Sequence, residues 1–121
     1  MKLALRQVGA PYAWGGARPD GFDCSGLVHY VYGSVGVVLP HNVAQQYRHG
    51  VAVARDKLRP GDLVFFDGLR HNGIYIGDGR FVHAATTADA VVISGLHERW
   101  YRSRWVGARR LLPPTSAARR D

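Results

Sequence analysis

The sequence has a single cysteine, so it cannot form an internal disulfide bond, and this leaves the redox state of its compartment open. It also lacks a long apolar run. The longest uncharged stretch, residues 24–47, is interrupted by glycines, a proline and two histidines, which excludes a membrane-spanning helix. Cysteine and histidine spacings typical of zinc sites are missing as well. What remains is a globular chain of 121 residues, long enough to bury one hydrophobic core.

Acidic residues are scarce, with 9 against 16 basic ones, and the excess is concentrated in residues 97–121. A basic surface of this kind suits a polyanionic partner, such as an acidic envelope polymer, an anionic lipid or a nucleic acid. Nucleic acid is the minority alternative, because no nucleic-acid-binding motif accompanies the charge, and no specific nucleic-acid partner is expected. A basic excess is also often no more than a solvated face.

The two ends of the chain carry little information about targeting. Residues 1–10 contain two basic residues but no long apolar core, so they do not predict a signal peptide. If the protein works outside the cytoplasm, we expect its export route to lie outside this chain. Residues 113–121 begin with two prolines and continue as a polar run, which predicts a disordered tail after a single domain at residues 1–112.

Apolar periodicity predicts helices in the first half of the chain and strands in the second. Helices are expected at residues 2–8, from residue 24 to about 33–36, and at 43–48, the last of them capped by Asn42. Strands are expected at residues 63–66, 71–76, 80–84, 91–93 and 105–112, and residues 96–102 are ambiguous. Helices followed by strands with short turns predict an α+β domain with an antiparallel sheet of about five strands.

Cys24 lies where a loop rich in glycine and proline gives way to the second predicted helix. Asp23 can cap the free N–H groups of this helix, which places Cys24 in the first turn. There the helix dipole and the N–H groups favour negative charge, so we expect a thiolate and a lowered thiol pKa. We interpret Cys24 as a nucleophile, against the alternative that a lone cysteine is a small, inert buried residue.

The hairpin at residues 71–84 decides whether two histidines can act together. A two-residue loop at residues 78–79 would place His71 on the opposite side of the sheet from His83. A three-residue loop at residues 77–79 makes them diagonal neighbours on one face and leaves the other face cleanly apolar. We therefore expect the three-residue loop, with Gly79 as the left-handed bulge residue.

A thiol peptidase needs a nucleophile, a base and a group that orients the base. His71 is our candidate for the base, which takes the thiol proton and later returns one to the leaving amine, and His83 would orient its ring. Either histidine alone is more often an ordinary surface or core residue, so the assignment depends on all three residues meeting. No carboxylate or cysteine recurs near the histidines at metal-ligand spacing, so we expect no metal and no cofactor.

Several separated motifs resemble those of the NlpC-type cell-wall cysteine peptidases. The likeness covers about residues 3–110, and it rests on the segments at residues 9–16, 21–28, 39–40, 45–46, 58–66, 71–77 and 81–84. The resemblance implies a papain-like fold, with N-terminal helices packed on the sheet. It also implies hydrolysis of peptide bonds in peptidoglycan stem peptides, typically between a D-γ-glutamyl residue and a diamino acid.

Matched position by position, the resemblance makes Cys24 the nucleophile, His71 the base and His83 the third polar residue. Tyr12 matches a tyrosine whose hydroxyl lies near the nucleophile and helps to bind the oxyanion. The backbone N–H of Cys24 would then be the second donor. The alternative for Tyr12 is a core aromatic residue with a satisfied hydroxyl.

Other positions extend the match or depart from it. Asp23 and Ser25 match positions that, in some members, hold the free amine of an L-Ala-terminated stem, and Asp23 can be a plain helix cap at the same time. Trp14 is expected to pack or to line the cleft. Asn72 stands where the family usually has an apolar residue, and His41 where arginine is common.

The prediction is a peptidoglycan endopeptidase that acts on stem peptides by a Cys-His-His mechanism. One alternative is an acyltransferase or amidase of the same fold that acts on another substrate, including lipids. A second is a non-catalytic basic binding module with an inert thiol. The predicted substrate implies a periplasmic, extracellular or cell-wall location. A toxin, a phage component and a wall-remodelling enzyme all stay open, and the oligomeric state is not predicted.

Overall fold

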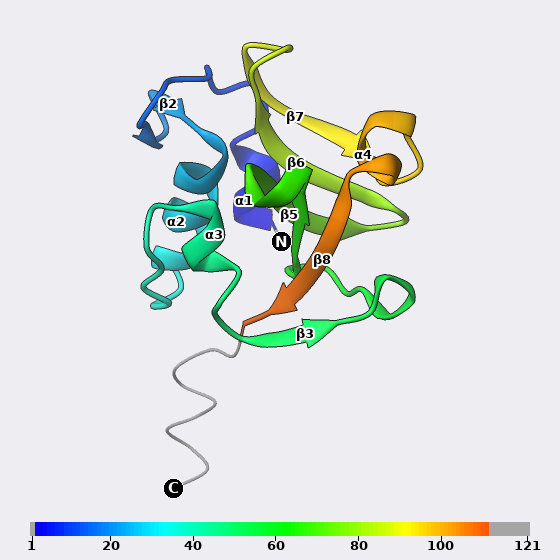
Figure 1. The fold of residues 1–121 in the computed structure, drawn as a ribbon. Coiled ribbons are helices and arrows are strands. Elements are labelled where there is room, and N and C mark those ends of the chain that lie inside the picture. Colours follow the sequence, from blue (N-terminus) through cyan, green and yellow to red (C-terminus); the bar gives the residue numbers. More distant parts are fainter. Residues whose placement is uncertain (1, 112–121) are drawn as a thin grey trace, which may run out of the picture.

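The computed structural model describes residues 2–111; the predicted tail at residues 113–121 and the domain limits at residues 1 and 112 lie outside the described residues. Three helices, α1 (Lys2–Arg6), α2 (Cys24–Gly33) and α3 (Val43–Gln46), gather on one side of a sheet (Figure 1). A short ribbon of β1 (Ala17–Arg18) and β2 (Gly21–Phe22) adjoins α2. None of the helices in residues 2–111 is long and apolar enough to cross a bilayer.

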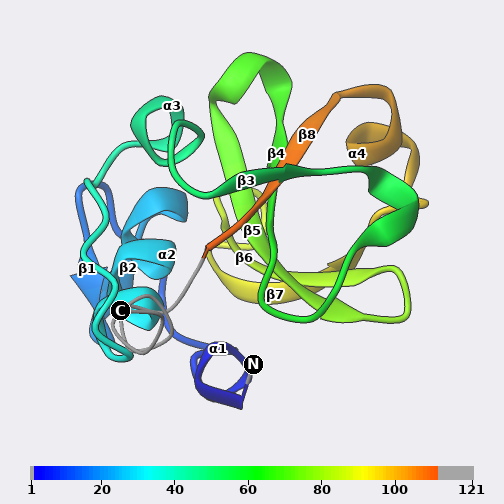
Figure 2. The ribbon, with the colours of Figure 1, turned by 90° about the horizontal axis from the view of Figure 1, so that it is seen from below.

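The main sheet has six antiparallel strands in the order β3-β8-β4-β5-β6-β7. They are β3 (Val51–Val53), β4 (Leu63–Phe66), β5 (His71–Gly77), β6 (Arg80–Ala85), β7 (Ala90–Gly95) and β8 (Trp105–Arg110). In Figure 2 the sheet curls away from the helical layer. The α+β prediction is confirmed, and the expected number of strands was one too low. The missed strand, β3, is a three-residue, largely exposed edge strand, so it carries no alternating apolar pattern.

The predicted helices are present, although two of them are shorter than expected. The first and third end at Arg6 and Gln46, each followed by a turn, and Asn42 caps the third by accepting from the Gln45 backbone N–H. The ambiguous segment contains a short α-helix, α4 (Arg99–Ser103), between β7 and β8. Local apolar periodicity therefore located the helices but not the last residues of two of them.

The turn between β5 and β6 differs from the expected one. It has two residues, 78–79, and both have positive φ (55° and 72°), as an Asp-Gly hairpin turn requires. The prediction of a three-residue loop is therefore wrong. A β-bulge between Tyr75 and Gly77 then shifts the register, so that Tyr75 pairs with Phe81. A three-residue loop without a bulge would have given the same pairing. The bulge restores the expected pairing over the rest of the hairpin.

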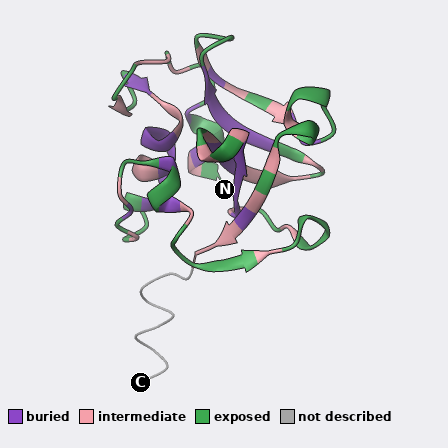
Figure 3. Ribbon diagram, viewed as in Figure 1, coloured by how far each residue is buried: buried purple, intermediate pink, exposed green. Residues whose placement is uncertain are grey.

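Both faces of the sheet are covered, which explains the uninterrupted apolar run in β4. Leu63 and Phe65 point into the core shared with α2, and Val64 and Phe66 point into a second cluster that Tyr101 of α4 helps to cover. All four side chains of β4 are fully buried. Figure 3 shows this burial along the centre of the sheet and on α2. Because α2 packs directly on β5 and β6, the cysteine at its first turn is brought to the edge of the hairpin that carries the histidines.

Candidate active site

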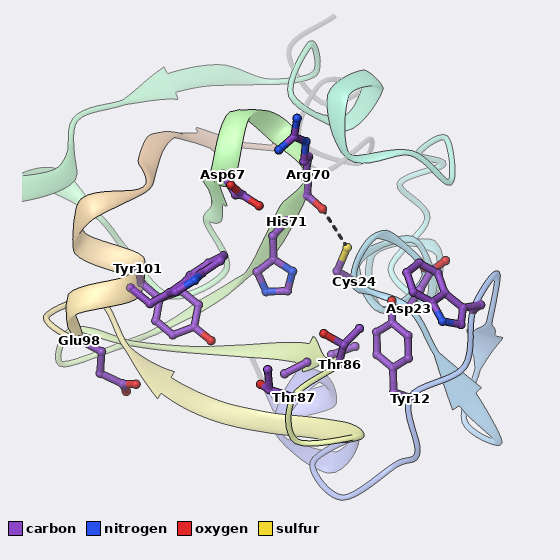
Figure 4. Close-up of a pocket in the computed structure, with 14 residues that line it drawn as sticks. Tyr12, Asp23, Cys24, Asp67, Arg70, His71, Thr86, Thr87, Glu98 and Tyr101 are labelled. Carbon is purple, nitrogen blue, oxygen red and sulfur yellow. Dashed lines mark hydrogen bonds between the residues drawn. The ribbon is translucent and has the colours of Figure 1, made fainter.

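A cleft of about 580 Å³ is lined by two of the three predicted catalytic residues (Figure 4), and the third, His83, is fully buried. Cys24, in the first turn of α2, and His71, the first residue of β5, both line it. Tyr12 and Asp23 form one end of the cleft, and the α4 region with Tyr101 forms the other. The site is therefore built where the helical layer meets the sheet.

Cys24 is neither sealed in the core nor fully exposed. Its thiol lies in the cleft, with Sγ 3.8 Å from the carbonyl oxygen of Arg70, the residue that precedes His71. The preceding residue, Asp23, caps α2 by accepting from the Gly26 backbone N–H at 2.7 Å, as predicted. The helix start thus presents the sulfur to the beginning of β5.

The two histidines meet on one face of the sheet, as the sequence predicted. His71 Nε2 lies 2.7 Å from His83 Nδ1, and His83 Nε2 lies 2.8 Å from the hydroxyl oxygen of Ser94 on β7. If Nδ1 of His71 is to accept a proton, its Nε2–H must donate to His83, whose own Nε2–H then donates to Ser94. Tyr101 flanks this chain, with its hydroxyl 3.5 Å from His83 Nε2.

Burial lowers the pKa of both imidazoles. The pKa of His71 falls to about 4, because the loss of solvent outweighs the opposing effect of the Asp67 carboxylate. The pKa of His83, which is fully buried, falls to about 3 through burial and the neighbouring His71. Both rings are therefore neutral near pH 7, which suits His71 to accept a proton.

The expectation of a lowered thiol pKa is wrong. Burial raises the pKa of Cys24 and the Asp23 carboxylate raises it further, while the backbone N–H groups of Asn72, Ser25 and Cys24 itself act in the lowering direction. The helix-start effect is thus present but smaller than the desolvation. The resting site is a neutral thiol beside a neutral imidazole rather than an ion pair.

Tyr12 and Trp14 occupy the end of the cleft next to Cys24. The Tyr12 hydroxyl points toward Cys24 (Figure 4), and burial and the charges of Cys24 and Asp23 raise its pKa. Its backbone N–H donates to the Asp89 carbonyl at 3.1 Å, and this bond ties the loop to the β6–β7 turn. Trp14 packs edge-on against Tyr12 and is 85% exposed, so it lines the cleft and is not a core residue.

The Asp23 carboxylate is held by four groups. Besides the Gly26 cap, Oδ1 accepts from the Ser25 hydroxyl at 3.4 Å and lies 2.7 Å from His41 Nε2, and Oδ2 accepts from the Gly15 N–H at 3.0 Å. Ser25 is buried behind Asp23, so its hydroxyl acts through the carboxylate. The sequence analysis noted His41 as unusual but did not predict this pairing, because the two residues are 18 positions apart.

A buried amide bridge that the sequence analysis missed lies beneath the catalytic residues. Asn72 Nδ2 donates to Gln46 Oε1 at 2.7 Å, and Gln46 Nε2 donates to the carbonyl oxygens of Ser25 (3.0 Å) and Pro40 (2.8 Å). The bridge therefore joins the residue after Cys24 to the residue after His71. Asn72 Oδ1 is buried without a hydrogen-bond partner. The one available signal was the polar residue at position 72 in an otherwise apolar strand.

Several other residues of the cleft wall also went unpredicted. They are Asp67 after β4, Arg70 before β5, Thr86 and Thr87 after β6, Glu98 at the N-cap of α4, and Tyr101 within α4. For Asp67, Thr86 and Thr87 the position directly after a strand was the available signal, because loops that follow strands commonly border a site. Within residues 2–111, no three His, Cys, Asp or Glu side chains gather into a group that could hold a metal ion.

Comparison with known proteins gives one consistent result. The sequence model of the NlpC/P60 family matches residues 9–110. Murein DD-endopeptidase MepH of Escherichia coli is 38% identical over 123 residues, which cover 94% of this chain and 45% of that protein. Gamma-DL-glutamyl hydrolase of Bacillus subtilis is 43% identical over 117 residues, which cover 91% of this chain and 28% of that protein.

The fold agrees with a solved structure as well. The crystal structure of an NlpC/P60 family protein from Bacillus cereus superposes with a TM-score of 0.88 at 38% identity, covering 93% of this chain and 39% of that one. The present chain spans less than half the length of each of these relatives.

Proposed function

Because the chain belongs to the NlpC/P60 family, we propose that it is a peptidoglycan endopeptidase whose reaction is carried out by Cys24, His71 and His83. The observation that carries this proposal is the arrangement of three groups: a thiol at a helix start and an imidazole that line one cleft, and a second, buried imidazole 2.7 Å from the first. A buried inert cysteine would have no such surroundings.

In the first half of the reaction, Nδ1 of His71 takes the proton of the Cys24 thiol as the sulfur attacks the carbonyl carbon of the substrate. The C=O double bond becomes an oxyanion, and the thiol proton now resides on His71. The Cys24 backbone N–H and the Tyr12 hydroxyl are the donors available for the oxyanion. His83 accepts the Nε2–H of His71 throughout, so the ring keeps its orientation as it gains charge.

In the second half, the imidazolium of His71 gives its proton to the leaving amine, the C–N bond breaks, and a thioester to Cys24 remains. Water then attacks this thioester with His71 again as base, and the carboxylic acid and free thiol are released. The low pKa of His71, about 4, makes the imidazolium a strong acid toward the leaving amine. This fits a base that starts neutral and must return its proton.

Asp23 is the proposed contact for a cationic group of the substrate. Its carboxylate lines the cleft beside Cys24, with Ser25 bonded behind it. A free terminal amine of a stem peptide could approach this carboxylate while the scissile carbonyl lies over the sulfur. Trp14, exposed at the same end of the cleft, would then cover an apolar part of the stem.

The proposed scissile bond lies between a D-γ-glutamyl residue and a diamino acid. The names of the two relatives refer to different bonds, one a DD-endopeptidase and the other a γ-DL-glutamyl hydrolase. The choice therefore rests on the motif resemblance and needs a direct test. A substrate in peptidoglycan also implies that the protein acts outside the cytoplasm.

Defined muropeptides provide that test. The protein and its Cys24→Ala variant are incubated with crosslinked and uncrosslinked stem peptides, and the products are weighed by mass spectrometry. We expect the wild-type protein to cut at the γ-glutamyl bond and to give two products whose masses add up to the substrate mass plus one water. We expect no products from Cys24→Ala. Cleavage only at the D-Ala crosslink would contradict the proposed bond, and transfer to an added amine or alcohol would point to an acyltransferase. Full activity of Cys24→Ala would rule out the mechanism.

A further inference from the structure

Asp23, which lines the cleft, lies against His41, and the catalytic steps above do not use this contact. His41 Nε2 lies 2.7 Å from Asp23 Oδ1, and the two side chains are 31% and 17% exposed. The ring of His41 stacks on that of His29, with centroids 6.0 Å apart and planes at 18°. His29 is itself fixed, because its Nδ1 lies 2.6 Å from the Leu39 carbonyl oxygen.

Among the described residues, Asp23 accepts from two backbone N–H groups and one hydroxyl, and these neutral donors leave its negative charge in place. His41 differs from them because an imidazole gains a full positive charge when it is protonated. The charge of Asp23 matters to the chemistry, since it raises the pKa of both Cys24 and Tyr12. The protonation state of His41 therefore affects the pKa of the Cys24 thiol through the Asp23 carboxylate, which lies next to both residues.

We propose that His41 is a positioning residue whose protonation sets how strongly Asp23 acts on the nucleophile. The inference rests on the proposed role of Cys24 as nucleophile. When His41 is charged, it neutralises Asp23, and the Cys24 thiolate forms more readily at a given pH. When His41 is neutral, Asp23 acts with its full charge and the thiolate fraction falls.

The groups around this pair belong to α2, which carries Cys24 and His29, and to the loop before β1, which carries Tyr12. Arg70, which directly precedes β5, lines the same cleft as Asp23. His71 is already neutral above about pH 5, because its pKa is about 4. His71 therefore keeps one charge state between about pH 5 and about pH 9.5, and an arginine side chain is charged over the whole of that range.

The test uses the rate of Cys24 alkylation by iodoacetamide from about pH 5 to about pH 9.5 at low salt. Cys24 is the only cysteine of the chain, so the label reports this thiol alone. His41→Arg places a permanent positive charge at this position, and His41→Gln places none there. We expect His41→Arg to react roughly threefold faster than His41→Gln throughout, which corresponds to about half a pKa unit. The wild type should follow the Arg variant at low pH and the Gln variant at high pH.

A wild-type profile parallel to one variant at every pH, or three coincident profiles, would overturn the inference. Asp23→Asn supplies the matched control, because asparagine caps a helix as well as aspartate does but carries no charge. In that background the Arg and Gln variants should react at the same rate, and a persisting difference would also overturn it. His41→Lys serves as a second permanently charged variant if His41→Arg folds poorly.

A general effect of added charge is checked with His49→Arg, since His49 is exposed and does not line the cleft. No change in alkylation is expected from it, and a threefold increase would count against a specific role for His41. The labelling needs no peptide substrate. Failure of muropeptide cleavage would therefore overturn the proposed function alone, while the alkylation profiles decide the role of His41.

Discussion

His83 is fully buried, and its Nδ1 lies 2.7 Å from Nε2 of His71. The two rings come from adjacent strands, β5 and β6, and stand nearly perpendicular, at 76°. A neutral imidazole in this position accepts the Nε2–H of His71 and passes its own N–H on to Ser94. The proposed base is therefore oriented by an uncharged partner, which can hold the tautomer but stabilises an imidazolium less than a carboxylate would.

This arrangement predicts an effect of replacing the orienting residue. His83→Leu removes the acceptor and lets His71 turn or change tautomer, so kcat should fall by roughly 10- to 100-fold. His71→Ala removes the base itself and should lower kcat by roughly 100-fold or more. Steady-state assays on a purified muropeptide measure both. Equal loss from the two variants, with circular dichroism showing a folded His83→Leu protein, would contradict a purely orienting role.

The low pKa of His71 predicts where activity is lost in acid. A base is active when it is unprotonated, so kcat/KM should not fall as pH drops through the ordinary histidine range and should decline only near pH 4, the pKa of His71. The pH dependence of kcat/KM, with protein stability checked at each pH, gives the measurement. An acid limb near pH 6.5 would instead indicate a solvated imidazole.

The buried histidines also predict that the fold loses stability in acid. His83 has a pKa of about 3 in the folded protein and about 6.5 in an unfolded chain, so the unfolded state binds more protons between these values. The contribution is fully present above about pH 6.5 and is lost as pH falls towards 3, by up to a few kcal/mol. Urea unfolding at about pH 7 and about pH 4.5 measures the loss. In His83→Leu, which has nothing to protonate there, the difference should shrink.

The amide bridge predicts unequal effects of its two members on stability. Gln46→Ala removes a fully buried side chain and leaves Asn72 Nδ2 without an acceptor, so it should lower the free energy of unfolding by about 3 kcal/mol. Asn72→Val should change it by less than about 1 kcal/mol. It removes the unpaired Asn72 Oδ1 but leaves Gln46 Oε1 unpaired instead, so the number of unsatisfied atoms in this bridge stays at one.

Urea or thermal unfolding of the two variants side by side measures the difference. The comparison is controlled within the bridge itself, because both side chains are buried and belong to the same network. If Asn72→Val proved as destabilising as Gln46→Ala, the Asn72 amide would have to contribute through more than its bond to Gln46.

Features that depend on nearby residues could be predicted from the sequence. The cap of α2 joins Asp23 to a backbone N–H three residues later, and the apolar spacing behind it is that of one helix face. The four-residue run of β4 matched its strand limits as well. These patterns also carried the assignment of Cys24, His71 and His83, which the family resemblance then matched. Each of them rests on contacts within one element or on side-chain alternation along a strand.

Features that depend on burial or on distant contacts could not be predicted in this way. The shared face of His71 and His83 was anticipated, but a bulge rather than a longer loop produces it, because turn and bulge shift the register in compensating ways. The partnership of Asp23 with His41 crosses 18 positions.

The sequence by itself predicted Cys24 as the nucleophile and determined that this residue begins a capped helix, since capping and helical spacing are local. The tertiary structure alone decided the direction of the thiol and imidazole pKa shifts, because desolvation depends on what packs around a group and not on its neighbours along the chain. It also decided which charges face the sulfur, because those side chains meet only when α2 is packed against the sheet.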